Sequence, residues 1–148
     1  MLITIELISA DDCYPLRSMV LRNGQDFSKC TFPEDYLETS FHLGALYDGK
    51  IISIGSFFKN SHLQLTAARN PYQLRGMATH PDARGIGAGA EILKKAETLI
   101  TERGGDLLWF NAREKAFPFY EKSGYIEVDG IITVSDFGPH KVMFKTLR

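Results

Sequence analysis

The stretch that most constrains the fold runs from Tyr72 to Gly89 and reads YQLRGMATHPDARGIGAG. Its first part, Tyr72–Thr79, predicts a strand, and Pro81 closes that strand because proline lacks the N–H that a central strand needs. A glycine-rich loop, Arg84–Gly89, follows, and beyond it apolar residues recur at the spacing of a helix with one buried face. Strand, loop and helix in this order indicate an α/β architecture.

The loop Arg84–Gly89 predicts a binding site for phosphate. Backbone N–H groups at the start of a helix point into solvent at the positive end of the helix dipole. Glycine has no Cβ, so a ligand can touch the backbone directly. The guanidinium of Arg84 can also bind phosphate oxygens in a fork. We therefore expect a pyrophosphate here, and a plain strand-to-helix turn is the alternative.

The remaining pattern predicts a β-α-α-β-β-β-α-β-α-β-β order, with a right-handed β-α-β unit at its centre. The other strands are expected at Leu2–Ile8, Phe41–Tyr47, Lys50–Phe58, Asp106–Ala112, Tyr125–Val128 and Val142–Leu147. The helices are expected from about Asp11 to Gly24, after Pro33, over Gly87–Arg103 and within Glu114–Ser123.

Composition narrows the class of protein. At 148 residues, 44% hydrophobic and 24% charged, the chain predicts a single domain over residues 1–148. A net charge of -1 argues against a nucleic-acid partner, because such proteins carry a basic excess. Cys13 and Cys30 form no metal-binding pattern, so we expect no metal and free thiols in a reducing cytoplasm. No stretch reads as a signal peptide or a membrane span, so no membrane partner is expected.

A second block stands downstream of the glycine loop. It comprises Asn111-Ala112-Arg113, then Ala116, then Phe119 through Tyr125 (FYEKSGY). The loop and this block together resemble the R/Q-x-x-G-x-G/A and N-x-x-A…F-Y-x-x-x-G-F/Y motifs of the Gcn5-related N-acetyltransferases (the GNAT superfamily). The resemblance is strong from Tyr72 to Tyr125, and it is closest to small stand-alone bacterial members.

This resemblance implies a fold and an activity. The fold would be an α/β one: a twisted mixed sheet of six to seven strands with two splayed parallel central strands, flanked by about four helices. The activity would be N-acetyl transfer from acetyl-CoA to an amine on a small molecule or a protein. No covalent acyl-enzyme is needed, since a neutral amine can attack the thioester directly in a ternary complex. A homodimer is an expectation from the fold alone.

The resemblance also assigns residues to acetyl-CoA. The loop would bind the pyrophosphate, the strand before it would bond the pantetheine, and Gly76 would turn an N–H toward the thioester oxygen. The implied CoA-binding residues are Met77, Ala78, Thr79, Arg84, Gly85, Ile86, Gly87, Ala88, Gly89, Asn111, Phe119 and Tyr120.

Tyr120 is the expected proton donor to the departing thiolate, because a phenol with a pKa of about 10 can donate to a thiolate. The alternative is a core tyrosine in an aromatic cluster with Phe117 and Phe119. For the base that deprotonates the amine we favour His140, and the remaining candidates are His42, His80, Glu38 and Glu114.

Two arginines next to the central strands, Arg75 and Arg113, stay open between two uses. Either they bind a carboxylate on the acceptor, or they pair internally with Asp35, Glu38 or Asp106. Internal pairing is the favoured use. Two other functions also stay open: a non-catalytic CoA sensor, and a partner-binding protein that takes no CoA. The acceptor itself cannot be named from the sequence.

Overall fold

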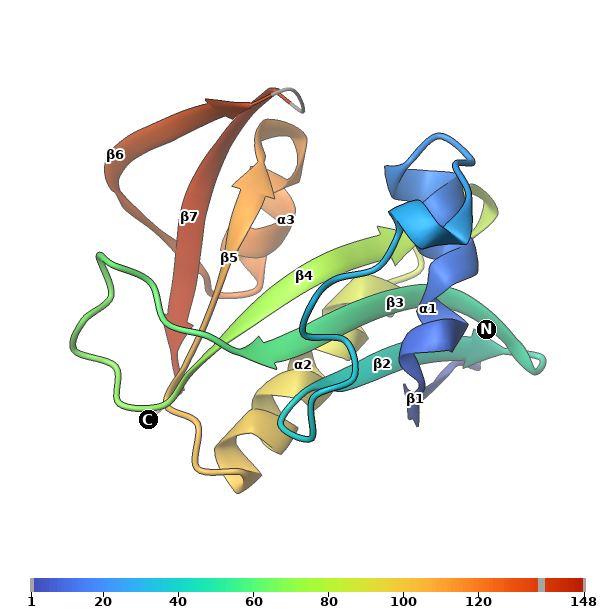
Figure 1. Ribbon diagram of the computed structural model, residues 1–148, viewed down its shortest axis with the longest axis horizontal. Coiled ribbons are helices and arrows are strands. Elements are labelled where there is room, and N and C mark those ends of the chain that lie inside the picture. Colours follow the sequence, from blue (N-terminus) through green and yellow to red (C-terminus); the bar gives the residue numbers. More distant parts are fainter. Residues whose placement is uncertain (1, 136–137, 148) are drawn as a thin grey trace. The chain divides into compact units, whose positions relative to one another are not determined.

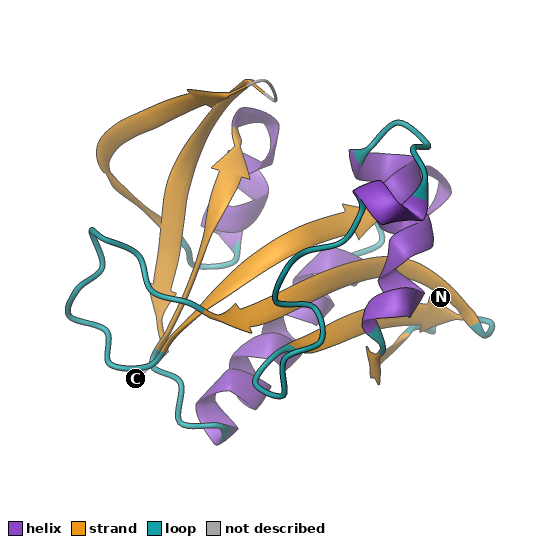
Figure 2. Cartoon of the chain, viewed as in Figure 1, coloured by secondary structure: helices purple, strands orange, loops and turns teal. Residues whose placement is uncertain are grey.

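The computed structural model describes residues 2–135 and 138–147, and the side chains of 2–128 and 138–147. Within them, seven strands form one sheet: β1 (Thr4–Ile8), β2 (Phe41–Tyr47), β3 (Lys50–Lys59), β4 (Pro71–Thr79), β5 (Leu107–Arg113), β6 (Ile126–Ser135) and β7 (Gly138–Thr146). The α-helices of the described chain are α1 (Ala10–Leu16), α2 (Ala88–Glu102) and α3 (Phe117–Lys122) (Figures 1 and 2).

The sheet is mixed, as expected. Its strand order is β1-β2-β3-β4-β5-β7-β6. β4 and β5 pair in parallel, with Pro71–Gln73 opposite Leu107–Trp109, and α2 connects them. The β1–β2, β2–β3, β5–β7 and β6–β7 pairs are antiparallel. A parallel β4–β5 pair within a sheet that also has these four antiparallel pairs confirms the predicted fold class.

The chain divides into two compact units. The first, here the N-terminal unit, comprises Met1–Phe58 and Leu74–Thr98. The second, here the C-terminal unit, comprises Lys59–Gln73 and Leu99–Arg148. The two units exchange segments along the sequence, because β4 and α2 each begin in one unit and end in the other.

The sheet of the N-terminal unit is covered on both faces. On one face, Ile54 of β3 packs with Cys13 and Leu16 of α1, and all three are buried. On the other, a Cβ at Gly55 would lie 3.4 Å from Ile92 of α2. Because neighbouring residues of a strand point to opposite faces, α1 and α2 cover opposite sides (Figure 1).

The C-terminal unit is also built around a strand with two covered faces. Trp109 of β5 donates from its indole N–H to the carbonyl of Asn60 at 2.9 Å, and its ring meets His62 edge-on at 4.8 Å. The next residue, Phe110, packs on the opposite face against Tyr120 of α3, with ring centroids 4.1 Å apart. This explains the nearly continuous apolar sequence of β5.

The first helix begins and ends as expected but changes type on the way. Ser9 and Asp12 form a capping box, with both side-chain-to-backbone hydrogen bonds at 3.1 Å. After Pro15, which contributes no N–H, the chain continues as a π-helix over Arg17–Leu21. The N–H of Gly24 then donates to a carbonyl of that segment, and its φ of +78° ends the helix.

The predicted helix after Pro33 is wrong. Residues 33–36 form turns, and a short 3-10 helix over Phe27–Lys29 lies upstream, so the described chain has three α-helices rather than about four. The reason is local: the Asp35 carboxylate accepts a hydrogen bond from the N–H of Phe32 at 2.8 Å, which folds the segment into a turn.

The last two strands are longer than expected. We expected a loop over residues 129–140, but β6 extends to Ser135 and β7 already begins at Gly138. Residues 136–137 lie outside the described chain. The register between β6 and β7 shifts between Glu127 and Ile132, so the extra residues are absorbed by a bulge in the ladder.

Candidate active site

The glycine loop has the conformation that a phosphate site requires. Gly85 and Gly87 adopt φ values of +83° and +86°, in the left-handed region that favours glycine. No atom lies within 4 Å of the positions where their Cβ atoms would be, so the outside of the loop is open. Arg84 is exposed, and α2 begins at Ala88, one residue later than predicted. The loop therefore presents backbone and a cation at the start of a 15-residue helix.

His80 helps to build this turn. Its Nδ1 accepts a hydrogen bond from the N–H of Asp82 at 3.1 Å, and its carbonyl accepts one from Ala83 at 2.9 Å. Its own N–H donates to the carbonyl of Ile52 at 2.8 Å. Among the candidate bases, His80 thus has a capping role in the 3-10 turn before the loop.

The end of β4 is kinked at Gly76, where φ is +70°. A Cβ there would lie 3.1 Å from Cε2 of Phe32 and 3.3 Å from Nε of Arg17, so glycine is needed for both conformation and space. Beyond it, the half-buried Met77 and Thr79 alternate with the buried Ala78, as expected of a strand.

Part of this strand end is already occupied by internal hydrogen bonds. The hydroxyl of Ser53 lies 3.2 Å from the carbonyl of Ala78 and 2.8 Å from Oγ1 of Thr79. Ala78 also packs in the core beside α1.

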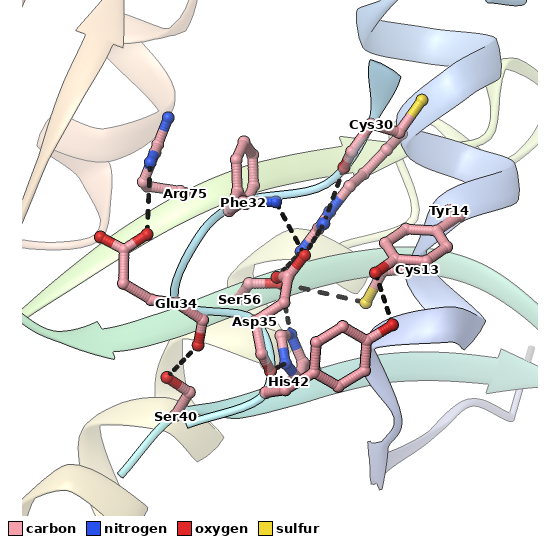
Figure 3. A network of polar contacts seen from close by, with 12 residues as sticks. Cys13, Tyr14, Cys30, Phe32, Glu34, Asp35, Ser40, His42, Ser56 and Arg75 are labelled. Carbon is pink, nitrogen blue, oxygen red and sulfur yellow. Dashed lines mark hydrogen bonds and ion pairs between the residues drawn. The ribbon is translucent and has the colours of Figure 1, made fainter. Parts of the chain in front are cut away.

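A buried ion pair lies directly behind Gly76. Arg17 donates from both terminal nitrogens to the carboxylate of Asp35, at 2.8 Å each, and both side chains are at most 1% exposed (Figure 3). Arg17 also donates to the carbonyl of Cys30 at 2.9 Å and to Oγ of Ser56 at 2.8 Å. Burial alone would raise the pKa of Asp35, but hydrogen bonds from Arg17 and the Phe32 N–H lower it below its usual value.

His42 completes this network, and its surroundings favour the neutral imidazole. Its Nε2 lies 2.9 Å from the carbonyl of Asp35, which can only accept, so Nε2 carries the proton. Its Nδ1 then accepts from the hydroxyl of Ser56 at 2.7 Å. Burial lowers the pKa of His42, consistent with this form. With both ring nitrogens engaged and 5% exposure, His42 is not placed to deprotonate an acceptor.

The ring of Phe32 joins this ion pair to Arg75. The guanidinium carbons of Arg17 and Arg75 lie 4.2 and 4.1 Å from its centroid. Both distances are within the range of a cation–π contact, so Phe32 contacts two cations. Arg75 in turn lies 3.8 Å from Oε1 of Glu34. It therefore pairs internally, as favoured, but with a carboxylate that we did not anticipate.

Two of the carboxylates named as partners for the arginines, Asp35 and Asp106, accept hydrogen bonds from other groups. Asp35 is paired with Arg17, and Asp106 accepts hydrogen bonds from the N–H groups of Arg69 and Asn70 at 2.8 and 3.0 Å. Asp106 therefore joins the start of β5 to the segment before β4, within the C-terminal unit.

Tyr120 lies in an aromatic cluster of the C-terminal unit. Its ring centroid is 4.1 Å from Phe110, 5.0 Å from Phe119 and 6.3 Å from Tyr125. Phe117, expected in this cluster, instead has the amine of Lys141 over its ring at 4.9 Å. Burial raises the pKa of Tyr120, so its hydroxyl stays protonated and keeps an O–H that can donate.

Asn111 and His140 lie on the other face of β5. Asn111 is exposed, and His140 pairs with Arg113 across β5 and β7. Residues that pair across two strands point to the same face, so His140 lies on the face of Arg113. Arg113 is three residues from Phe110 and therefore points to the opposite face from Phe110, on which Tyr120 packs. His140 and Tyr120 are therefore not brought together on one face of the strand.

Within the part of the chain that the structure describes, no group of three or more His, Cys, Asp or Glu side chains is arranged to hold a metal ion. Likewise, no helix within the described ranges combines the length and the apolar character that crossing a bilayer would require.

Comparison with known proteins agrees with this geometry. Residues 10–125 match the acetyltransferase (GNAT) family. The chain belongs to the GNAT family of acetyltransferases. It is 41% identical over 147 residues to YitI of Bacillus subtilis, described as an uncharacterized N-acetyltransferase, and the match covers 99% of this chain and 98% of that one. The protein is accordingly an N-acetyltransferase by family.

Solved GNAT structures share the fold at low identity. An aminoglycoside 6'-N-acetyltransferase, crystallised with coenzyme A, superposes with a TM-score of 0.78 at 15% identity, covering 98% of this chain and 97% of that one. A GNAT-family acetyltransferase from Staphylococcus aureus gives 0.74 at 14% identity, covering 99% and 100%. At such identities the likeness establishes the fold.

Sequence reasoning missed the Arg17 network in this GNAT protein. The sequence did contain an indication of this network. Arg17 follows Cys13 by four residues and Tyr14 by three, and residues at these spacings share one face of a helix, so a cation lies on the apolar face of the first helix. A charge in that position predicts a buried partner. Asp35 and Glu34 gave no comparable signal, because they belong to a turn that was expected to be a helix.

Proposed function

We propose that the protein transfers an acetyl group from acetyl-CoA to the amine of an acceptor by direct attack in a ternary complex. The observation that carries the proposal is the open loop at Gly85 and Gly87, whose left-handed backbone precedes the first turn of α2. The fold relative crystallised with coenzyme A lends support, although it is only 15% identical.

The loop would hold the pyrophosphate of the donor. Arg84 supplies a side-chain cation, and the backbone N–H groups of Gly85, Ile86, Gly87, Ala88 and Gly89 supply donors at the positive end of α2. The first N–H groups of a helix have no acceptor within the helix, so a phosphate would accept hydrogen bonds that these groups otherwise donate to water. Backbone groups of Met77, Ala78 and Thr79 would bond the pantetheine as an added strand does.

Acetyl-CoA supplies an acyl group that is activated as a thioester. The kink at Gly76 is suited to aim an N–H out of the β4 ladder, where it would stabilise the oxyanion that develops during attack. Tyr120, protonated because it is buried, would donate to the departing thiolate, and Asn111 and Phe119 would contact the CoA arm. His140 remains the proposed base.

The proposal is tested by binding and turnover of the purified protein. Titration calorimetry with millimolar acetyl-CoA should give a binding heat, and CoA release over a panel of primary amines should be followed with a thiol reagent. The protein's own thiols should not interfere, because both cysteines are buried and burial raises the pKa of Cys13 to about 11. Absence of any binding heat would refute the donor assignment.

The role of Tyr120 has its own test. Tyr120→Phe should lower kcat by about 100-fold, the usual contribution of a positioned acid, and leave acetyl-CoA affinity nearly unchanged. Tyr47→Phe is the matched control, since Tyr47 is 41% exposed at the end of β2. Full turnover by Tyr120→Phe would mean that this tyrosine is only part of the aromatic cluster.

A further inference from the structure

Two buried polar atoms without a hydrogen-bond partner lie near each other in the N-terminal unit. Among the described side chains, only Nε of Arg17 and Oε1 of Glu34 are shielded from solvent and unpartnered. Arg17 packs on Phe32, and Glu34 faces Arg75, which packs on the same ring (Figure 3). Buried polar groups are nearly always satisfied, so two exceptions around one ring need an explanation.

Nε of Arg17 and the partner of Glu34 lie at the kink of β4. Nε of Arg17 is 3.3 Å from the position of a Cβ at Gly76, and Phe32 is 3.1 Å from it. Arg75, which faces Glu34, is the residue immediately before Gly76. In the proposed function, the N–H at this kink would point to the reacting carbonyl, so the acceptor would arrive beside Arg17 and beside Arg75, the partner of Glu34.

Of Glu34 and Asp35, Glu34 is the carboxylate whose oxygen can still accept a hydrogen bond. Asp35 accepts from both terminal nitrogens of Arg17 and from the N–H of Phe32, so each of its oxygens is engaged. Oε1 of Glu34 lies 3.8 Å from Nη1 of Arg75, which neutralises charge but is too long for a hydrogen bond. An added donor at Oε1 would therefore complete its hydrogen bonding without breaking an existing bond.

The segment that carries Glu34 is held rigidly. Its carbonyl accepts hydrogen bonds from Oγ of Ser40 at 2.7 Å and from the N–H of Leu37 at 3.2 Å. The next residue, Asp35, is fixed by the buried ion pair with Arg17. A carboxylate on such a turn is preorganised, so little entropy is lost when it binds a ligand.

We infer that Glu34 binds the protonated amine of the acceptor, and that the acceptor is therefore an alkyl primary amine that is charged at neutral pH. The inference rests on the proposed function. An ammonium group brings three donors and a positive charge, which match an ionised carboxylate with a free oxygen. Arg75 balances the charge of Glu34 and holds its carboxylate in place through the stack on Phe32.

The reaction balances with this assignment. The bound ammonium first loses one proton to the base, for which His140 is proposed, and the nitrogen lone pair then forms the C–N bond to the carbonyl carbon while the C–S bond breaks. The nitrogen loses its second proton as the intermediate collapses. The products are the amide and a CoA thiol that has gained one proton, with one proton released overall. Glu34 binds and orients the amine, and the overall balance needs no oxidant or metal.

The test compares Glu34→Gln with the wild-type protein and with Glu102→Gln, a matched change at an exposed position of α2. The probes are benzylamine, which is an alkylammonium at pH 7, and aniline, which is neutral. Each is measured with acetyl-CoA as a substrate or, if it is not acetylated, as a competitive inhibitor. A hydrogen bond to a charged group predicts a loss of benzylamine affinity of about 10- to 100-fold in Glu34→Gln. Aniline affinity, acetyl-CoA affinity and the Glu102→Gln control should change less than about threefold.

The outcomes separate the inference from the proposed function. If Glu34→Gln lost benzylamine affinity and aniline affinity equally, Glu34 would have a structural role. If it lost affinity for neither amine, Glu34 would not bind the ammonium. Each of these results overturns the inference and leaves the proposed function standing. A wild-type protein that binds no acetyl-CoA or acetylates no amine would overturn the proposed function as well. If Glu34→Gln does not fold, Glu34→Asp keeps the charge and shortens the reach, and should lose benzylamine affinity selectively.

Discussion

Asp35→Asn is the substitution that most directly tests the buried ion pair. Asparagine keeps the shape of aspartate but removes the charge and replaces one oxygen by a donor. The wild-type carboxylate accepts three hydrogen bonds at 2.8 Å, two from Arg17 and one from the N–H of Phe32. After the change, an NH₂ group faces donors, and the guanidinium of Arg17, 1% exposed, remains charged without a counter-ion.

Breaking a buried pair by removing one partner costs about 3–5 kcal/mol, because the remaining charge is left uncompensated. Domains of this size have about 5–15 kcal/mol of total stability, so the loss is a large fraction of it. At about 2–4 °C per kcal/mol, the melting temperature should fall by about 6–20 °C. Cation–π contacts of Arg17 with Tyr14 and Phe32 reduce the cost only in part.

The assay is urea unfolding followed by far-UV circular dichroism and by the fluorescence of Trp109, the single tryptophan. The two probes should coincide if both units unfold together, and only then is one free energy defined. Asp82→Asn, at a side chain that is 93% exposed, is the control and should change stability by less than about 0.5 kcal/mol. A loss below about 1 kcal/mol for Asp35→Asn would refute the buried charge. Combining it with Arg17→Gln should cost less than the sum of the single changes.

Two further predictions concern pH and the donor loop. Burial lowers the pKa of His42 in the folded protein below its ordinary value of 6.5. As the pH falls, the unfolded chain therefore binds the proton before the folded protein does. The free energy of unfolding should decrease as the pH falls below about 6.5, and it should stop decreasing below the pKa of His42 in the folded protein. His42→Gln should flatten this dependence in unfolding titrations between pH 7 and pH 5, and an unchanged slope would assign it to other groups. Arg84→Glu, at an exposed position, should weaken acetyl-CoA binding by at least about tenfold in calorimetry while the melting temperature stays within about 2 °C. Equal affinity would show that Arg84 does not contact the donor.

The order of the strands and the long helix could be read from the sequence because each depends on local signals. β2 was predicted to the residue, since Asp48 and Gly49 mark the turn after it, and both have positive φ. The limits of α2 followed from its apolar spacing and from the glycines at each end. The glycine loop was readable for the same reason, because left-handed backbone requires a particular residue type.

The turn at residues 33–36 could not be read in this way. Proline followed by two acidic residues is a common helix start, and the local pattern favoured it. The outcome was decided by Arg17, eighteen residues away from Asp35, which makes the carboxylate part of a buried pair instead of a helix cap. No local propensity contains that contact, and the partner of Arg75 was misassigned as a result.

The two halves of the reaction differ in how the sequence encodes them. The proposed donor side uses one contiguous stretch, from Gly76 to Gly89, in which the left-handed backbone at Gly76, Gly85 and Gly87 depends on glycine. On the acceptor side, the proposed ammonium site depends on groups from five separate places in the chain: Arg17, the turn at residues 32–35, His42, Ser56 and Arg75. Backbone recognition of a phosphate tolerates changes elsewhere, whereas a charged site built from tertiary contacts changes with any of its members. A fixed donor and a variable acceptor are the expected result, because substitutions in the acceptor network can alter the amine that is bound without altering how acetyl-CoA is held.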